Sequence, residues 1–460
     1  MQSTFKYNNL KQKNMETIIE KVEKFTRSIT MKAFIIGILT LIMLIPGVMI
    51  QNLISERQKR SEETISKINA KWSNAQTLTG PVLVIPYTTH ETDAGNKAVI
   101  GNHTLYLTPE LLTFKANLIP EERHYGIYKS ILYQSELEIS GNFAKPEILL
   151  PENCQIKWNE ANIRIGISDL RGLSNNPDYV MNELHFSAEA GGAQDVIGQG
   201  LVISLKNSSL LQAGKALSFK SILKLKGSSN INFIPVGRTT RVQMNGAWKS
   251  PGFIGSFTPQ YSLNEQGFSA KWDILHFNRN IPETWTDQQI KSFNDTSFGV
   301  NLVDTLDQYQ QNMRSAKYSL MFIALTFVVF FFVEILTGKK IHPIQYLLVG
   351  IALILFYSLL LSVSEQINFG MAYLIASIAT IGLIVVYAHS IFKNKMQTGI
   401  LASFLTLLYV FLYVVLQLED IALLIGSIGL FIILGVIMYF SRKINWYKPE
   451  NKSMDILLEV

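Results

Sequence analysis

The sequence predicts an integral membrane protein with six α-helical spans and a large, mainly-β domain inserted between the first and second spans. Three observations predict this fold class. The 460 residues have a mean hydropathy of +0.19 and are 48% hydrophobic, whereas a soluble enzyme of this length is more polar on average. The longest uncharged stretches lie at residues 33–55 and in the C-terminal third. Between them the chain consists of short runs broken by Gly, Pro, Asn and Ser.

Residues 1–32 form a basic tail that holds seven basic and three acidic residues. Apolar residues recur within it at helical spacing, with lysines and an arginine around them: Met15, Ile18, Ile19, Val22 and Phe25. This pattern predicts a short amphipathic helix on the anionic inner surface of a membrane. A helix that docks on a protein partner is the alternative.

Residues 33–55 carry no charge, and the run is long enough to cross the hydrocarbon core, which takes about 20 residues. The preceding segment is too long for the start of a signal peptide, and no Ala-x-Ala cleavage site follows. We therefore expect an uncleaved anchor. Pro46 and Gly47 near its outer end predict a kink.

Residues 56–79 are predicted to continue this span as a helical stalk, and residues 80–295 to form a sandwich-like antiparallel β domain. The clearest strand covers residues 217–227, where apolar residues alternate with lysines. Whether the region holds one domain or two stays open. Further strands are expected at residues 81–87, 103–109, 132–141, 163–169, 183–190, 200–206 and 267–277.

Residues 296–317 return to helical spacing and are predicted to form a second helical stalk that runs straight into the next span. A bundle of five helices then occupies residues 318–441, and a cytoplasmic tail follows at residues 442–460. The five spans are expected at residues 318–336, 344–363, 370–392, 398–418 and 421–440.

The charges of the connecting loops predict how the chain crosses the membrane. The loops TGKKIHP and KNKMQ and the final segment SRKINWYK carry lysine and arginine, whereas SEQINFG and QLED carry only acids. The positive-inside rule places the basic segments in the cytoplasm. Both termini are therefore expected in the cytoplasm, and the β domain outside it.

The net charge of +6 does not indicate a nucleic-acid partner, because its distribution is uneven. Residues 55–316 hold 25 basic and 25 acidic residues, so the whole excess lies in the two ends of the chain. A neutral domain lacks the basic surface that nucleic acids require. The only cysteine, Cys154, can form no intramolecular disulfide, and we expect a buried thiol there.

No motif predicts catalysis, a cofactor or a metal site. The seven histidines form no HExxH-like pair, and neither a G-x-S-x-G elbow nor a phosphate-binding P-loop is present. Groups far apart in the sequence can still converge, so an envelope hydrolase remains an alternative. The sequence predicts no catalytic residue, and it leaves the oligomeric state open.

Three ionisable residues lie near the cytoplasmic ends of the predicted spans: Glu334, His342 and His389. One interpretation is that each side chain reaches the membrane interface by itself. The other is that they converge as a proton-linked or ligand-linked site. Polar residues in the third span are explained by interhelical hydrogen bonds: Tyr357, Ser358, Ser362 and Ser364.

The most distinctive stretch of the β domain is VGRTTRVQMNGAWKSPGFIGSFTP, residues 236–259. A strand is predicted in which Arg241 and Gln243 share one face, and a turn and a further strand follow. We expect its aromatic residues to anchor the core. Its arginines are expected to pair with acids such as Asp273, with an anionic lipid headgroup as the alternative. Its candidate signature residues are Arg238, Arg241, Trp248, Pro251 and Phe253.

Several blocks resemble the CreD family of bacterial inner-membrane proteins. They occur in order as INAKWSNAQTLTGPVLVIPY, RHYGIYKSILYQSELEISGNF and ANIRIGISDLRGL, then the distinctive stretch with GFSAKWDILHFNRNIP, which resembles the family's Arg-Trp-Pro-Phe block. The segments from SFGVNLVDTLDQYQQ and from HPIQYLLVG resemble its membrane half. The resemblance covers residues 33–392 and continues less distinctly to the end. Residues 1–30 show no family pattern.

This resemblance implies an inner-membrane protein of envelope integrity, linked to a two-component stress response, colicin tolerance and β-lactam response. It supplies no catalytic residues and no cofactor. The expected function is non-enzymatic: the β domain binds an envelope component, either a protein or a lipid. A transporter or lipid-handling protein that uses the five-helix bundle is the main alternative.

Overall fold

The computed structural model describes residues 29–92, 98–144, 154–192, 197–206, 216–286, 293–302, 308–337, 341–418 and 421–442. The chain divides into two compact units. The helical unit comprises Met1–Arg60 and Leu306–Val460, and the β unit comprises Ser61–Thr305. The amphipathic helix predicted around residues 15–25 and nearly all of the predicted C-terminal tail lie outside the described residues.

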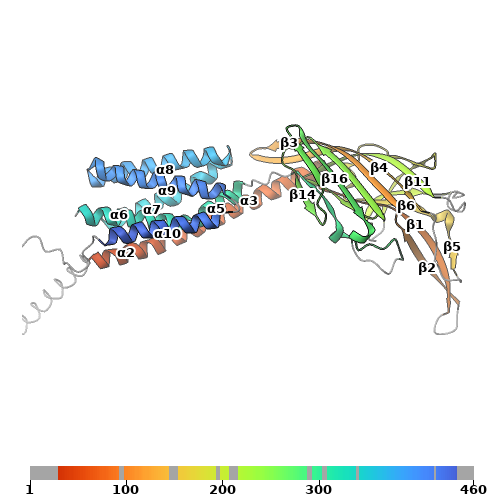
Figure 1. The fold of residues 1–460 in the computed structure, drawn as a ribbon, viewed down its shortest axis with the longest axis horizontal. Coiled ribbons are helices and arrows are strands. Elements are labelled where there is room, and N and C mark those ends of the chain that lie inside the picture. Colours follow the sequence, from red (N-terminus) through yellow and green to blue (C-terminus); the bar gives the residue numbers. More distant parts are fainter. Residues whose placement is uncertain are drawn as a thin grey trace, which may run out of the picture. The chain divides into compact units, whose positions relative to one another are not determined.

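Eight helices are described in or entering the helical unit, and α7, α8 and α9 pack side by side in chain order (Figure 1). The helix α3 begins in this unit and continues into the β unit. The helices are α2 (Ile29–Ile42), α3 (Leu44–Trp72), α5 (Gln308–Lys317), α6 (Ser319–Thr337), α7 (Pro343–Ser364), α8 (Phe369–Phe392), α9 (Lys395–Gln417) and α10 (Ala422–Ser441).

Among the described residues, four helices are long and apolar enough to cross a membrane, when α2 and α3 count as one. The other three are α7, α8 and α9. The pair α5 and α6 makes a fifth candidate if it forms one broken span, and α10 is a shorter apolar helix. The structure thus agrees with several apolar spans, and the count of six stays a prediction.

Two breaks in the helices have local causes. The helix α2 ends at Ile42 and α3 begins at Leu44, because Pro46 has no N–H to donate to Ile42 and its ring crowds that carbonyl. The prediction of a straight passage into the second span is wrong, since α5 and α6 meet at 43°. At this bend the Tyr318 N–H donates to Ser315 O, three residues earlier, which tightens the turn.

Short polar side chains cap the N-terminal ends of α8 and α9. Asn368 accepts the N–H of Met371 at the start of α8, and Asn394 accepts the N–H of Met396 at the start of α9. Such caps satisfy backbone donors that have no partner inside the helix. The predicted loops before α8 and α9 therefore each end at a capping asparagine.

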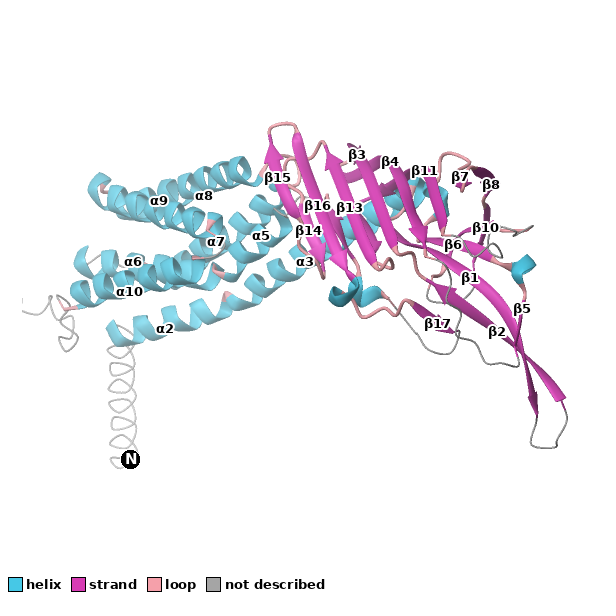
Figure 2. Ribbon diagram, turned by 45° about the vertical axis from the view of Figure 1, so that its right-hand side comes forward, coloured by secondary structure: helices cyan, strands magenta, loops and turns pink. Residues whose placement is uncertain are grey.

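The β unit contains two sheets of ten and eight strands (Figure 2). The ten-stranded sheet comprises β1 (Gln76–Thr92), β2 (Ala98–Leu107), β5 (Cys154–Ile156), β6 (Asn162–Ile167), β9 (Glu189–Gly192), β10 (Gln199–Ser204), β12 (Asn230–Ile234), β14 (Gly252–Gly255), β17 (Thr284–Thr286) and β18 (Phe298–Asn301). The eight-stranded sheet comprises β3 (Leu111–Tyr125), β4 (Tyr128–Phe143), β7 (Asp178–Met181), β8 (Leu184–Ser187), β11 (Leu217–Ser228), β13 (Thr239–Gly246), β15 (Gln260–Asn264) and β16 (Gly267–Leu275). Short 3-10 helices connect strands at Trp158–Glu160, Leu170–Gly172, His276–Asn278 and Asn294–Thr296.

The two sheets share one hydrophobic core, as a sandwich requires. Phe114 of the eight-stranded sheet lies 4.9 Å from Phe233 of the other sheet, measured between ring centroids. Trp272 and Phe298 make a second contact between the sheets, at 5.5 Å. The predicted sandwich-like fold is therefore present, and its apolar faces account for the stability of the unit.

The sequence led us to expect purely antiparallel sheets, but the two sheets also contain parallel strand pairs. The strand β1 runs parallel to β12, and β3 runs parallel to β13. Both pairs join segments more than a hundred residues apart in the chain, so no hairpin turn marks them in the sequence.

Both predicted stalks are shorter than expected. The first helix ends at Trp72, and residues from Gln76 onward belong to β1. In the second stalk, Phe298 and Val300 are fully buried members of β18, which pairs with β12 and β14. Strands on both sides pair with these residues, so this part of the chain belongs to the sheet and not to a helix.

Candidate functional site

A buried carboxylate lies in the membrane helices of the helical unit. The Glu334 side chain of α6 is 3% exposed, and its Oε1 lies 2.8 Å from Lys32 Nζ of α2. The Ile341 N–H donates to the same oxygen at 3.2 Å, and the Tyr346 hydroxyl of α7 donates to Oε2 at 2.9 Å. One carboxylate therefore joins α2, α6 and α7.

Glu334 therefore has partners on α2 and α7, and whether it also reaches the membrane interface stays a prediction. A charge in an apolar helix bundle is stable only when a counter-ion and hydrogen-bond donors surround it. Lys32 supplies the counter-ion, and it lies 302 residues away in the sequence. A sequence signal existed, because Lys32 and Glu334 are both predicted at the cytoplasmic ends of their spans.

The two histidines do not join this cluster through any hydrogen bond or ion pair among the described residues. His342 is exposed and caps α7, with its Nδ1 accepting the Ile344 N–H at 3.3 Å. His389 is exposed near the end of α8, and its Nδ1 lies 3.3 Å from Thr398 Oγ1. The structure thus supplies no contact that unites Glu334, His342 and His389 in one site.

A second polar cluster surrounds Glu365, at the opposite end of α7. The Tyr309 hydroxyl of α5 donates to Glu365 Oε1 at 3.2 Å, and Arg57 of α3 lies 4.0 Å from its other oxygen. Next to it, Asn312 Nδ2 donates to Ser364 Oγ at 2.8 Å. This cluster therefore attaches α3 and α5 to the end of α7. These are the two helices that connect to the β unit along the chain.

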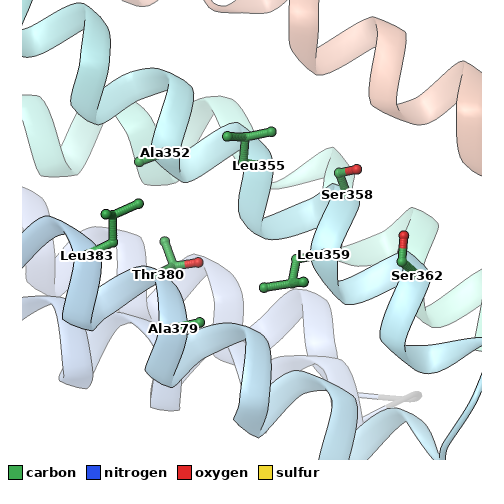
Figure 3. Close-up of a pocket in the computed structure, with 8 residues that line it drawn as sticks. All are labelled: Ala352, Leu355, Ser358, Leu359, Ser362, Ala379, Thr380 and Leu383. Atoms are coloured by element: carbon green, nitrogen blue, oxygen red, sulfur yellow. The ribbon is translucent and has the colours of Figure 1, made fainter.

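The bundle contains two grooves on either side of α8. The larger, with a volume of about 570 Å³, lies between α8 and α9, and its polar residues are Asn368, Tyr373, Ser377, Thr406, Tyr409 and Tyr413. The other, about 360 Å³, lies between α7 and α8 (Figure 3). Volumes of this size are typical of sites for small molecules or acyl chains.

In the β unit, the distinctive stretch of residues 236–259 connects the two sheets through β13 and β14. In β13, Arg241 is exposed between the buried Thr240 and Val242, as the sequence predicts. Arg241 Nε lies 3.3 Å from Asp273 Oδ1 of the neighbouring strand β16. Arg241 therefore makes the intramolecular pairing that the sequence favours.

Arg238 pairs with two acids, Glu110 at 3.5 Å and Glu283 at 3.2 Å. All three side chains are more than 40% exposed, so solvent screens these contacts and each contributes little to stability. The Arg238 N–H also donates to Pro109 O at 2.7 Å, which fixes the start of the stretch.

The aromatic residues of the stretch pack against the core from its edge. Trp248 is half-buried, and its Nε1 donates to Ser250 O at 3.2 Å. Phe253 of β14 makes an edge contact with Trp272, with 6.0 Å between centroids. Pro251 precedes β14 and is also half-buried. These positions agree with the prediction that the aromatic residues anchor the core.

Sequence reasoning missed Arg279, which is 7% exposed. Its Nε donates to Gly237 O at 2.9 Å and its Nη1 donates to Ile281 O. Its Nη2 has no hydrogen-bond partner among the described residues. Burial lowers the pKa of this guanidinium to about 10, and the charge of Glu283 opposes the shift. No local pattern marks this arginine, because its partners are backbone carbonyls.

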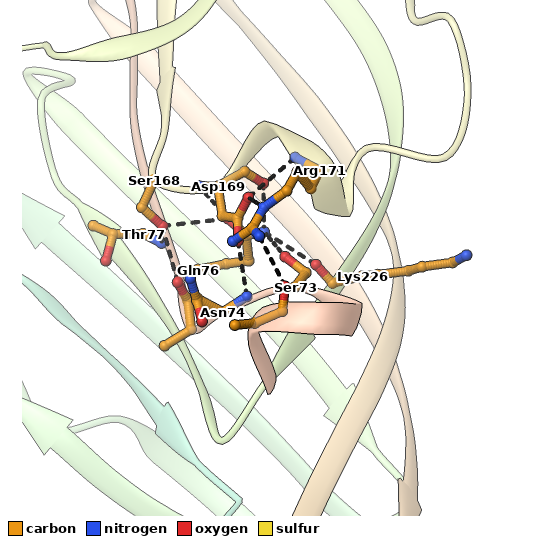
Figure 4. Close-up of polar contacts among 10 residues, drawn as sticks. Ser73, Asn74, Gln76, Thr77, Ser168, Asp169, Arg171 and Lys226 are labelled. Atoms are coloured by element: carbon orange, nitrogen blue, oxygen red, sulfur yellow. Dashed lines mark hydrogen bonds and ion pairs between the residues drawn. The ribbon is translucent and has the colours of Figure 1, made fainter. Parts of the chain in front are cut away.

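A network around Asp169 holds the end of α3 to the first strand of the β unit (Figure 4). Its carboxylate accepts the Asn74 N–H at 2.9 Å and the Arg171 Nη2 at 2.7 Å. Gln76 Nε2 donates to the carbonyl of Asp169 at 2.8 Å and to Lys226 O at 3.0 Å. The hydrogen bond from Arg171 is the main cause that lowers the pKa of Asp169 to about 2, against burial.

The outer face of the eight-stranded sheet carries rows of exposed charged residues. Glu138 of β4 lies between Lys115, at 3.4 Å, and Lys220, at 3.1 Å. The hydrogen bond from Lys220 is the largest cause that lowers the pKa of Glu138. Asp273 of β16 likewise lies between Arg241 and Lys271, which approaches to 2.8 Å.

Within the described residues, no three His, Cys, Asp or Glu side chains are grouped as metal ligands. Cys154 is a half-buried free thiol in β5, at the edge of the core.

Comparison with known proteins identifies the family. Residues 28–447 match the family model described as "Inner membrane protein CreD". The chain is also 32% identical over 435 residues to the inner membrane protein CreD of Escherichia coli (strain K12), and the alignment covers 91% of this chain and 94% of that protein. Together with its apolar helices and large β-rich unit, these matches show that the chain belongs to the CreD family of inner membrane proteins.

Proposed function

We propose that this protein supports the integrity of the bacterial cell envelope without catalysis, by binding an envelope component through its β unit. In this proposal the β unit lies outside the cytoplasm, between the first and second of six spans, and both termini are cytoplasmic. The helical unit holds the β unit at the membrane and responds to its bound state.

The distribution of charge in the loops supports this topology. Lys393 lies between α8 and α9, Lys395 is the first residue of α9, and Arg442 follows α10. The connection between α7 and α8 contains Glu365 and no basic residue. Under the positive-inside rule, the basic connections face the cytoplasm and the acidic one faces outward. An odd number of spans after the β unit then places that unit outside.

The outer face of the eight-stranded sheet is the observation that carries the proposal. Its charged side chains are exposed: Lys115 by 57%, Lys220 by 58%, Arg241 by 51% and Lys271 by 48%. Strands that contribute to this face span five positions of the sheet order, from β16 to β11. A broad, rigid face of this kind can bind a polar or anionic envelope molecule through many weak contacts.

Charge reversal tests the proposal directly. A double variant, Lys220→Glu and Lys271→Glu, is expressed in cells that lack the native protein. Because exposed ion pairs contribute at most about 1 kcal/mol, we expect normal membrane levels and a nearly unchanged melting temperature. Protection of the envelope, measured as survival under detergent or β-lactam challenge, should be lost.

The matched control reverses the half-buried Lys157 and the exposed Lys206 on connections of the ten-stranded sheet, as Lys157→Glu and Lys206→Glu. It changes net charge equally and should protect cells as the wild type does. Wild-type survival of the Lys220 and Lys271 variant would refute the proposed binding face. Equal loss in both variants would mean that net charge, and not this face, matters.

A second candidate function, lipid handling or transport by the helical unit, is favoured by the groove between α8 and α9. Its Ser377 side chain is 7% exposed and belongs to the lining of this groove. This candidate predicts that Ser377→Leu, which fills the groove, and Glu334→Gln both abolish envelope protection at normal membrane levels. Wild-type protection by both variants would exclude it.

A further inference from the structure

The hairpin of β3 and β4 extends beyond the rest of the eight-stranded sheet. On one side, β13 pairs with β3 only as far as Leu118, and on the other, β11 pairs with β4 only from Leu132 onward. The strands β3 and β4 continue to pair with each other up to Tyr125 and Tyr128. Among the described residues, no third strand flanks residues 119–131, the β3–β4 ribbon. Because an isolated pair of strands is only marginally stable in water, the ribbon depends on contacts outside the sheet.

The helix α3 supplies such contacts at the base of the ribbon. The Ser130 hydroxyl of β4 donates to Asn69 Oδ1 of α3 at 2.5 Å. The Arg123 guanidinium of β3 lies 4.4 Å from the centre of the Trp72 ring, and Lys226 Nζ lies 4.6 Å from the same ring. Cations over a tryptophan ring are attracted by its negative face. The ribbon is therefore attached to the last turn of α3.

The contacts also give the direction in which the ribbon points. Asn69 contacts Ser130, whereas Gln76, which follows the helix, donates through Nε2 to Lys226 O at 3.0 Å. Lys226 lies opposite Gln134 of β4. Later residues of the segment that joins α3 to β1 thus contact later positions of β4, further from the hairpin turn. The end of the ribbon therefore lies in the opposite direction, toward the N-terminal part of α3.

That part of α3 belongs to an apolar segment long enough to cross a membrane. The ribbon ends at Ile127, about 10 Å beyond Ser130 at the rise of a strand. This distance corresponds to about seven residues of helix, so the end of the ribbon is level with Glu62 of α3. The uncharged run ends at Ser55, about 10 Å further along the helix, and the headgroup layer covers about 5–8 Å of that distance. Side chains at the end of the ribbon can therefore reach the headgroups.

The end of the ribbon carries large side chains in exposed positions. Tyr125 is 66% exposed and Ile127 is 36% exposed, and Tyr128 beside them is half-buried. Tyrosine is enriched where a bilayer meets water, because its ring is apolar and its hydroxyl is polar. These residues therefore suit the interface of a membrane better than bulk water.

The acidic and basic side chains of the ribbon neutralise each other. Two ion pairs form within it: Arg123 with Glu121 at 3.0 Å, and Lys129 with Glu122 at 2.8 Å. The ribbon consequently presents no excess of positive charge to anionic lipids. A contact with a bilayer would rest on its tyrosines and isoleucine, and it would be insensitive to salt and to lipid charge.

We propose that the end of the β3–β4 ribbon, Tyr125–Tyr128, lies in the headgroup layer of the bilayer that α3 crosses. Its partner is the phospholipid surface, which it contacts through neutral aromatic and apolar side chains. The contact gives the β unit an attachment to the membrane in addition to its helices. This inference depends neither on the proposed binding face of the β unit nor on the side of the membrane where that unit lies.

Quenching by spin-labelled lipid tests the contact in the full chain. In a Cys154→Ser background, Ile127→Cys carries a fluorescent label, and the protein is placed in phosphatidylcholine nanodiscs with a nitroxide on the lipid headgroup. The label should lose most of its fluorescence. The matched control is Ile222→Cys, which is 41% exposed and lies opposite Glu138 of β4, further from the hairpin turn. Its label should keep its fluorescence, and equal quenching at both positions would overturn the proposal.

Substitution of Tyr125 and the choice of lipid supply two further readouts. With the label at Ile127→Cys, Tyr125→Asp should reduce quenching to the level of the control, whereas Tyr125→Trp should preserve it. Because Tyr125 is exposed, both variants should keep the melting temperature of the parent. Phosphatidylglycerol or high salt should leave quenching unchanged. Full quenching in Tyr125→Asp, or quenching that appears only with phosphatidylglycerol, would contradict the neutral contact.

Discussion

Replacing Asp169 with asparagine should loosen the junction between α3 and β1. The carboxylate accepts four hydrogen bonds, from the backbone N–H groups of Asn74 and Arg171 and from Nε and Nη2 of Arg171, at 2.7–3.1 Å. Asparagine keeps the shape but loses the charge and replaces one acceptor oxygen with a donor. At least two of the four bonds are therefore lost.

The magnitude follows from the pKa of Asp169, which falls from 3.8 to about 2 on folding. A shift of this size corresponds to about 2 kcal/mol at neutral pH. Because Arg171 is 58% exposed, solvent screens part of the interaction, and we expect about 1–2 kcal/mol. The folded pKa lies below the unfolded one, so this stability is present above about pH 4 and is lost as the pH falls toward 2.

Hydrogen exchange of the full chain in lipid nanodiscs measures the effect locally. In Asp169→Asn, amides of residues 73–79 should exchange roughly five to thirty times faster at pH 7, since each 1.4 kcal/mol is a factor of ten. Asp178→Asn is the matched control, because Asp178 pairs with His185 at an exposed site. The reasoning is wrong if both variants exchange alike, or if the effect of Asp169→Asn persists undiminished below pH 2.

Two other substitutions test the packing of each unit. Lys32→Met leaves Glu334 buried without a counter-ion, and the melting temperature in detergent should drop by the equivalent of about 3 kcal/mol. Adding Glu334→Gln should restore most of the lost stability. If the double variant stayed as unstable as Lys32→Met, the pairing would be contradicted. Gly200→Ala places a Cβ 1.8 Å from the carbonyl oxygen of Ile165, so the β unit should resist trypsin poorly, with a cost of about 3 kcal/mol or more. Gly382→Ala, where nothing lies within 4 Å, should leave stability equal or slightly higher, and a loss as large as that of Gly200→Ala would contradict this account.

Much of the fold was predictable because its signals are local. The strand β11 alternates buried Leu217 and Phe219 with exposed Ser218 and Lys220, and the same period marks β13. Apolar runs marked the membrane helices equally well. The pairing of Arg241 with Asp273 followed because both lie on exposed faces of strands that prove to be neighbours.

The remainder depends on contacts between distant segments. The ion pair of Lys32 with Glu334 joins helices at opposite ends of the chain, and the parallel pairing of β1 with β12 has no turn to mark it. The strand β18 was taken for helix, because its four residues precede a longer helical pattern. Arg279 is bound by carbonyls, which the sequence does not distinguish. These contacts can be identified only in the folded structure, where segments distant in the sequence lie next to each other.

The central claim is that the β unit faces the envelope, outside the cytoplasm. In a Cys154→Ser background, a cysteine at Gln243 on the exposed face of β13 can be labelled with a membrane-impermeant maleimide in intact spheroplasts. Met396→Cys, in the first turn of α9 at its predicted cytoplasmic end, is the counterpart, because Met396 is 76% exposed. The proposed topology predicts that Gln243→Cys is labelled at once and Met396→Cys only after permeabilisation. The reverse pattern would contradict it.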